Sequence, residues 1–251
     1  MKYTTPWALL LVFSAAIAVA GYAGASSGQA EPPATRRAIV AHRLDVAPPT
    51  TDAPPSPFVA ELAGALERDA SRWPEAAIPH VPTGDVAMSV AVAVEELGDE
   101  PCPIPMSEGD WRMTDSQEAR GVLAMALAYF EGARFASYVD DLSCNDRSWR
   151  KSPEGRALVH VGGHCDGGLA YSLWQVHVEG MLLSVDPSGV TAEKMSDRAY
   201  AARVGLTLAC RSLASTGSLV GYTGEGRSFH PKADQRLDFA RRFVPRELQR
   251  E

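Results

Sequence analysis

The segment DSQEARGVLAMALAYFEG, residues 115–132, decides the fold class because it has the marks of a buried α-helix. Asp115 or Ser116 is placed to cap its N-terminus, and Glu118 follows in the first turn, where the helix dipole favours a negative charge. We expect the helix to end near Glu131, since a glycine follows. One face of this helix gathers apolar residues, namely Val122, Leu123, Ala126, Leu127 and Phe130.

Helical patterns continue on both sides of this segment. Phe58, Leu62 and Leu66 recur at every fourth position, as on a buried helix face. Asp197 is placed to cap a further helix over residues 197–214. A last helix is expected over residues 232–243, with inward-facing apolar residues Leu237, Phe239, Ala240 and Phe243.

Other segments are less regular. Residues 85–97 alternate valines with alanines, and the alanines favour a helix that Asp85 caps. Residues 143–170 are rich in glycine and polar residues, and ALVHV at 157–161 is expected to form a short strand. Residues 215–229 are expected to form a glycine-rich loop. The prediction is a mostly α-helical single domain, residues 58–251, with long loops and a short β insertion in its middle.

Composition excludes several classes of protein. The chain has 251 residues, is 45% hydrophobic and 22% charged, and so is neither disordered throughout nor a multi-pass membrane protein. Its net charge of -7 argues against nucleic-acid binding, which usually needs a basic face. We expect a monomer without a metal or an organic cofactor.

The N-terminus has the layout of a bacterial signal peptide over residues 1–25. Lys2 precedes an apolar run from Trp7, and Ala-x-Ala patterns follow. Residues 26–57 are rich in proline and alanine, which predicts an extended linker. We therefore expect an exported protein, periplasmic or secreted, whose mature chain has no integral membrane domain.

Two segments carry candidate chemistry. Glu131 ends the quoted helix among aromatic residues, surroundings that favour a protonated carboxyl able to act as a general acid. The segment GGHCDGGLAYSLWQVH, residues 162–177, combines glycines, which permit close approach of a ligand, with Tyr171 and Trp174, whose rings offer faces to a sugar. The amide of Gln175 is suited to fixing a polar group of a substrate.

These motifs resemble the lysozyme-like superfamily, in particular soluble lytic transglycosylases and goose-type lysozymes. The family has a glutamate at a helix end, matched here by FEGARF at 130–135, and a Gly-Leu-Met-Gln-like segment, matched by SLWQ at 172–175. A third family element, a Tyr-Asn-x-Gly-like turn, is matched by YTGEG at 222–226. The three occur in the family's order within residues 85–245. Gly132, Ser172 and Thr223 depart from the family's Ser, Gly and Asn.

The resemblance implies cleavage of the β-1,4 bond between N-acetylmuramic acid and N-acetylglucosamine in peptidoglycan, with Glu131 as general acid/base. Asp166 stands where goose-type lysozymes have an aspartate that positions water for hydrolysis; otherwise it stabilises a glycine-rich turn. The partners expected are glycan strands, contacted in the groove by Tyr171, Ser172, Trp174, Gln175 and Tyr222.

Four cysteines allow three disulfide pairings in an exported protein. We favour Cys144–Cys165, which would pin the inserted loop beside the second motif, and then Cys102–Cys210 by elimination. The spacing of nearby histidines is not that of a standard zinc site. The alternative functions are a Cys–His peptidase and a wall-binding module without catalytic activity.

Overall fold

The computed structural model confirms that the chain is mostly α-helical, with small two-stranded antiparallel sheets. All residues that it describes belong to one compact unit, Val46–Glu251. The predicted signal peptide, most of the predicted linker and Asp166 lie outside the described residues. Those residues are 54–75, 77–105, 113–162, 165, 168–178, 182–223 and 230–244.

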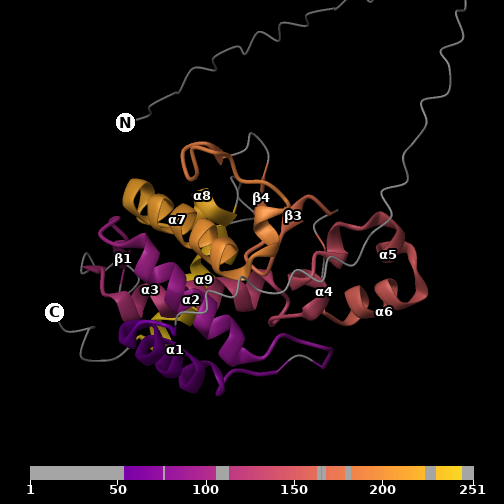
Figure 1. Cartoon of the computed structure of the whole chain (residues 1–251), viewed down its shortest axis with the longest axis horizontal. Coiled ribbons are helices and arrows are strands. Elements are labelled where there is room, and N and C mark those ends of the chain that lie inside the picture. Colours follow the sequence, from indigo (N-terminus) through magenta and orange to yellow (C-terminus); the bar gives the residue numbers. More distant parts are fainter. Residues whose placement is uncertain are drawn as a thin grey trace, which may run out of the picture. The chain divides into compact units, whose positions relative to one another are not determined.

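Long helices build the body of this unit. Helix α2 packs against α1, α3 and α7, and α3 also packs against α9 (Figure 1). These helices are α1 (Pro57–Ala70), α2 (Thr83–Leu97), α3 (Gln117–Glu131), α7 (Arg198–Thr216) and α9 (His230–Phe243). The predicted helices are thus present, and α1 begins within the predicted linker, since Ser56 caps it.

Helix α3 lies at the centre of the core. Every side chain from Ala119 to Tyr129 is buried, Arg120 included, which is more than the single apolar face that the sequence indicated. Ser116 caps the helix as expected, accepting a hydrogen bond from the Ala119 backbone nitrogen at 3.1 Å. The helix ends at Glu131, also as expected, with Gly132 at its C-terminal cap.

Helix α2 confirms the choice of helix over strand for residues 85–97, but the expected cap is wrong. Pro82 occupies the N-cap position and Asp85 lies in the first turn instead. The helix therefore begins at Thr83, three residues before Val86, where a helix capped by Asp85 would begin. Asp85 still contributes a favourable charge near the positive end of the helix dipole.

The strand expected at 157–161 is wrong, because these residues form the second half of helix α6 (Pro153–Gly162). Proline is favourable at the first turn of a helix, and the Ser152 hydroxyl accepts a hydrogen bond from the Gly155 nitrogen at 2.9 Å. These local signals outweigh the β-branched residues Val159 and Val161. The short β insertion is found further along, where β3 (Ala170–Tyr171) pairs with β4 (Val176–His177).

Short elements complete the fold. Helices α5 and α6 lie together at one end of the body (Figure 1). Strands β1 (Ile104–Pro105) and β2 (Met113–Thr114) form a second small sheet. The remaining short elements are α4 (Ser137–Asp140), η1 (Ser143–Asn145), α5 (Arg147–Lys151), η4 (Lys194–Ser196) and α8 (Val220–Thr223). Helix α8 occupies part of the segment expected to be loop throughout.

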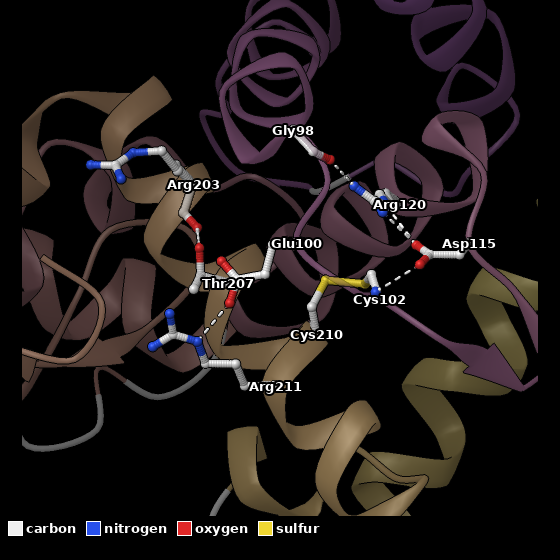
Figure 2. Close-up of a disulfide and its surroundings, with 9 residues drawn as sticks. All are labelled: Gly98, Glu100, Cys102, Asp115, Arg120, Arg203, Thr207, Cys210 and Arg211. Atoms are coloured by element: carbon white, nitrogen blue, oxygen red, sulfur yellow. Dashed lines mark hydrogen bonds and ion pairs between the residues drawn. A yellow bond between two sulfur atoms is a disulfide. The ribbon is translucent and has the colours of Figure 1, made fainter.

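Both favoured disulfides are present. Cys102–Cys210 ties the segment after α2 to α7 across 108 residues of sequence (Figure 2). Beside it, Asp115 accepts hydrogen bonds from the Cys102 backbone nitrogen at 3.1 Å and from the buried Arg120 at 2.7 Å. Arg120 also donates to the Gly98 carbonyl at 2.6 Å. The disulfide thus fixes the segment after α2 to α7, and the buried arginine fixes the start of α3 to the end of α2.

The second disulfide, Cys144–Cys165, closes the inserted region that contains α5 and α6. Asn145 adds to this closure by donating to the carbonyls of Gly168 and Ala170, at 3.1 and 2.9 Å. The region is therefore joined to the strand β3 that leads into the second motif. Within the described ranges, no helix has the length and apolarity needed to cross a membrane.

Candidate active site around Glu131

Glu131, the last residue of α3, forms an ion pair with Arg236 of α9. Fractions of 21% of the Glu131 side chain and 9% of the Arg236 side chain are exposed. Arg236 is further held by the Lys232 carbonyl, to which its Nη1 donates at 2.9 Å, and its guanidinium lies over the Phe130 ring at 5.4 Å. The candidate acid is thus near the surface, with a fixed cation beneath it.

Arg236 is a site residue that the sequence analysis missed. The sequence pattern that could have identified it is the spacing of α9, where the buried residues Ala233, Leu237 and Ala240 recur as on one helix face. Arg236 falls on that same face and is itself buried. Because a buried arginine is almost always paired, its position indicates an acidic partner.

Aromatic rings surround the end of α3, as expected. The Tyr129 ring contacts Phe130 edge-on, with centroids 5.6 Å apart, and stacks on Phe239 at 5.4 Å. Trp73 packs edge-on against Tyr129 at 5.2 Å and against Phe239 at 4.9 Å. This cluster fixes the helix end rigidly, although Arg236 makes the surroundings of Glu131 more polar than the sequence indicated.

The backbone directly after Glu131 is strained. Ala133, Arg134 and Phe135 all have left-handed conformations, with φ of 51°, 62° and 62°. Each such residue disfavours folding by roughly 1–2 kcal/mol, and strain of this kind concentrates at functional sites. The run is held in place by hydrogen bonds, including one of 2.8 Å from the Val81 nitrogen to the Phe135 carbonyl.

The second motif forms the tight turn between β3 and β4, and it is strained as well. Ser172 and Gln175 have φ of 63° and 47°. The Gln175 side chain donates to the Ser172 carbonyl at 2.9 Å, which closes the turn. Ser172 is buried and Gln175 is half-buried, so Gln175 is the residue of this turn better placed to meet a ligand.

The turn lies directly against the end of α3. A Cβ atom at Gly132 would be 2.5 Å from the Ala128 carbonyl oxygen and 2.9 Å from both Cδ2 and the carbonyl oxygen of Leu173. No side chain fits in that space. Gly132 therefore lets the second motif approach Glu131 closely.

Tyr222, the first residue of the third motif, reaches the same place, whereas residues 224–226 lie outside the described residues. The Tyr222 hydroxyl, from α8, donates a hydrogen bond of 2.6 Å to the Trp174 carbonyl. Burial raises the pKa of Tyr222 well above its usual value, and the nearby Glu131 carboxylate raises it further. The hydroxyl therefore remains protonated and keeps donating. Three segments, at Glu131, 172–175 and Tyr222, thus meet at one site.

Some predicted ligand contacts do not fit their positions. Trp174 is fully buried, its Nε1 donates to the Ala124 carbonyl at 3.0 Å, and its ring packs against Gly205. The indole therefore offers no exposed face to a sugar, contrary to expectation. Tyr171 is half-buried and packs against the core, and Asp166 lies outside the described residues.

The cysteines that a Cys–His peptidase would need as nucleophiles are oxidised. All four cysteines are in disulfides, so Cys144 and Cys165 are not thiol nucleophiles. In the described part of the chain, no group of three His, Cys, Asp or Glu side chains is arranged to hold a metal ion. Asp140, a carboxylate of α4, accepts hydrogen bonds from Nε and Nη2 of Arg198 at 2.9 and 2.6 Å.

No protein-family model matches the chain, and no curated protein or solved structure matches it. Any function assigned to the chain therefore rests on the side chains gathered around Glu131 and on the resemblance of the three motifs to those of the lysozyme-like superfamily.

Proposed function

We propose that the chain cleaves the β-1,4 bond between N-acetylmuramic acid and N-acetylglucosamine in peptidoglycan, as a lytic transglycosylase with Glu131 as general acid/base. One observation carries this proposal: the convergence of Glu131, the 172–175 turn and Tyr222 at one site. The three motifs come from separate parts of the sequence, and they span 92 residues from Glu131 to Tyr222 (222 − 131 + 1). Backbone strain on both sides of the junction supports a functional role.

The chemistry needs a single carboxyl group. Glu131 donates its proton to the glycosidic oxygen as the bond from that oxygen to C1 of N-acetylmuramic acid breaks. The resulting carboxylate then removes the proton of the 6-hydroxyl of the same sugar, and that oxygen bonds to C1. Glu131 is protonated again, no water is consumed, and the product is a 1,6-anhydro sugar.

The surrounding groups have supporting roles in this proposal. The Tyr222 hydroxyl fixes the Trp174 carbonyl and hence the turn that carries Gln175. Gln175 contacts the sugar through its amide, while Trp174 supports the site from the core. The position of reacting groups matters, since a shift of about 1 Å reduces a rate by roughly 100-fold.

Export of the protein is part of the proposal. Two disulfides are typical of proteins in oxidising compartments, which in bacteria lie outside the cytoplasmic membrane. Residues 1–25 supply the pattern of a signal peptide. Peptidoglycan lies in that same compartment, so the substrate and the protein would meet there.

Mass spectrometry of fragments released from purified peptidoglycan tests the reaction. Anhydro-muropeptides, lighter by one water than hydrolysed fragments, are the expected products. Reducing-end fragments would instead indicate hydrolysis of the goose type and make Asp166 the next residue to substitute. Binding to peptidoglycan without any released fragment would indicate a binding module and contradict the proposal.

A further inference from the structure

The ion pair between Arg236 and Glu131 conflicts with the role of a general acid. A carboxyl group donates a proton only when it holds one, whereas a guanidinium stabilises the ionised carboxylate through a charge-assisted hydrogen bond. In this structure the Arg236 Nε donates to Glu131 Oε1. The candidate acid is therefore held by a cation that opposes transfer of its proton.

The arginine is the fixed partner of the pair. Its side chain is the more buried of the two, at 9% exposed against 21% for Glu131. The Lys232 carbonyl and the Phe130 ring hold the guanidinium from two further sides. Separation of the pair therefore requires either movement of the Glu131 side chain or a proton on it, because Arg236 has little room to leave.

Two other neighbours of Glu131, Tyr222 and the 172–175 turn, bring no charge to it. Tyr222 from α8 stays protonated and uses its hydroxyl on the Trp174 carbonyl. The 172–175 turn brings Ser, Leu, Trp and Gln, which carry no charge. Of these neighbours, it is α9 that supplies, through Arg236, the charged group that contacts Glu131.

We propose that Arg236 is a positioning residue that engages the Glu131 carboxyl group in the resting protein, so that cleavage requires this ion pair to open. This inference rests on the proposed function, since it concerns the protonation of the same acid. It predicts that removal of the guanidinium makes the Glu131 carboxyl group more reactive and changes the pH dependence of cleavage.

The first test reads the ion pair without using activity. Carbodiimide-driven coupling of glycinamide to Glu131 at pH 7, followed by peptide mass spectrometry, measures how freely the carboxylate reacts. We expect at least tenfold faster modification in Arg236→Met than in the wild type. Arg241→Met is the matched control, because Arg241 lies on the same helix and pairs with Asp238 instead. Equal rates in the wild type and Arg236→Met would overturn the proposal.

The second test is the pH profile of fragment release from peptidoglycan. The decline in rate as the pH rises should set in at a higher pH in Arg236→Met than in the wild type, by about one pH unit or more. Arg236→Lys, which retains the charge, should restore the wild-type profile. A folded Arg236→Met that is inactive at every pH would overturn the proposal, because Arg236 would then be required for cleavage itself.

Two further arrangements keep the result interpretable. If Arg236→Met does not fold, Arg236→Gln takes its place, since glutamine retains hydrogen bonding without the charge. If no protein releases fragments at any pH while Glu131 is still modified faster in Arg236→Met, the proposed function fails and the ion pair itself is verified. The two failures are therefore distinguishable.

Discussion

At the scale of single residues, Gly132 determines how closely the second motif approaches Glu131. We expect Gly132→Ala to lower the free energy of unfolding by about 2–3 kcal/mol, because its Cβ would collide with the Ala128 and Leu173 carbonyl oxygens. Fragment release should fall at least about 100-fold in the protein that remains folded. Denaturant unfolding and peptidoglycan digestion measure the two effects.

Gly64→Ala is the control for this substitution. Gly64 lies within α1, and the nearest atom to its added Cβ is at 3.4 Å, at the end of the flexible Arg68 side chain. Alanine should be neutral or stabilising there by up to about 1 kcal/mol. A Gly132→Ala protein as stable and active as Gly64→Ala would contradict the close approach.

Tyr222 offers a second test at this scale. Tyr222→Phe removes the 2.6 Å hydrogen bond to the Trp174 carbonyl, which should destabilise the protein by about 1–2 kcal/mol. We expect fragment release to fall by about tenfold or more, because the turn that carries Gln175 loses its anchor. Tyr200→Phe also loses a hydrogen bond, to Asp186 at 2.7 Å, but away from this site. It should be destabilised without a comparable loss of activity, and equal losses in both would contradict a specific role for Tyr222.

At the scale of elements, Asp186 organises the segment that leads into α7. It accepts hydrogen bonds from the Tyr200 hydroxyl, from Lys194 at 2.9 Å, and from the Ser188 hydroxyl and nitrogen. These bonds, that of Tyr200 first, hold the pKa of Asp186 well below its ordinary value of 3.8. In return, burial and the Asp186 hydrogen bond raise the pKa of Tyr200 to about 12.

The sign of the pH dependence follows from this lowered pKa. The folded state binds a proton at Asp186 less readily than the unfolded state, so its stabilisation is present above pH 4 and is lost as the pH falls below about 4. Urea unfolding between pH 7 and pH 2 should show a smaller loss of stability for Asp186→Asn than for the wild type. Asp69→Asn is the control, because Asp69 faces the exposed Arg72 at 3.8 Å, and the loss of so weak a pair should leave the pH profile unchanged. Identical pH profiles for Asp186→Asn and the wild type would contradict this account.

Some features of the fold could be predicted from local sequence patterns, and others could not. The helix that ends at Glu131 was predicted with Asp115 or Ser116 as its cap, and Ser116 is the cap found; its capping residues, dipole charges and apolar positions all agree. Residues 157–161 were predicted wrongly as a strand, since the Pro153 and Ser152 signals lie outside the window of apolar residues. The burial of Trp174 depends on its contacts with α3 and α7, which no local pattern specifies. Arg236 was missed because its partner is 105 residues away in the sequence.

At the scale of the whole molecule, the two disulfides should contribute unequally. Cys102–Cys210 spans 108 residues and Cys144–Cys165 spans 21. By chain entropy these loops correspond to about 5 and about 3 kcal/mol of stabilisation, so the double alanine variant of the first pair should unfold at a lower guanidinium concentration. The variant lacking Cys144–Cys165 should lose more activity for each kcal/mol of lost stability, because that bridge ends beside the second motif. The reverse ranking in both measurements would contradict these roles.

Release of soluble fragments from purified sacculi tests whether Glu131 is the acid of a peptidoglycan-cleaving site. The comparison is the folded, oxidised wild type with Glu131→Gln, which preserves size but has no proton-donating carboxyl. Glu118→Gln, at the exposed start of the same helix α3, is the control. We predict that the wild type and Glu118→Gln release anhydro-muropeptides, and that Glu131→Gln is slower by at least about 100-fold. Undiminished release by Glu131→Gln would contradict the claim.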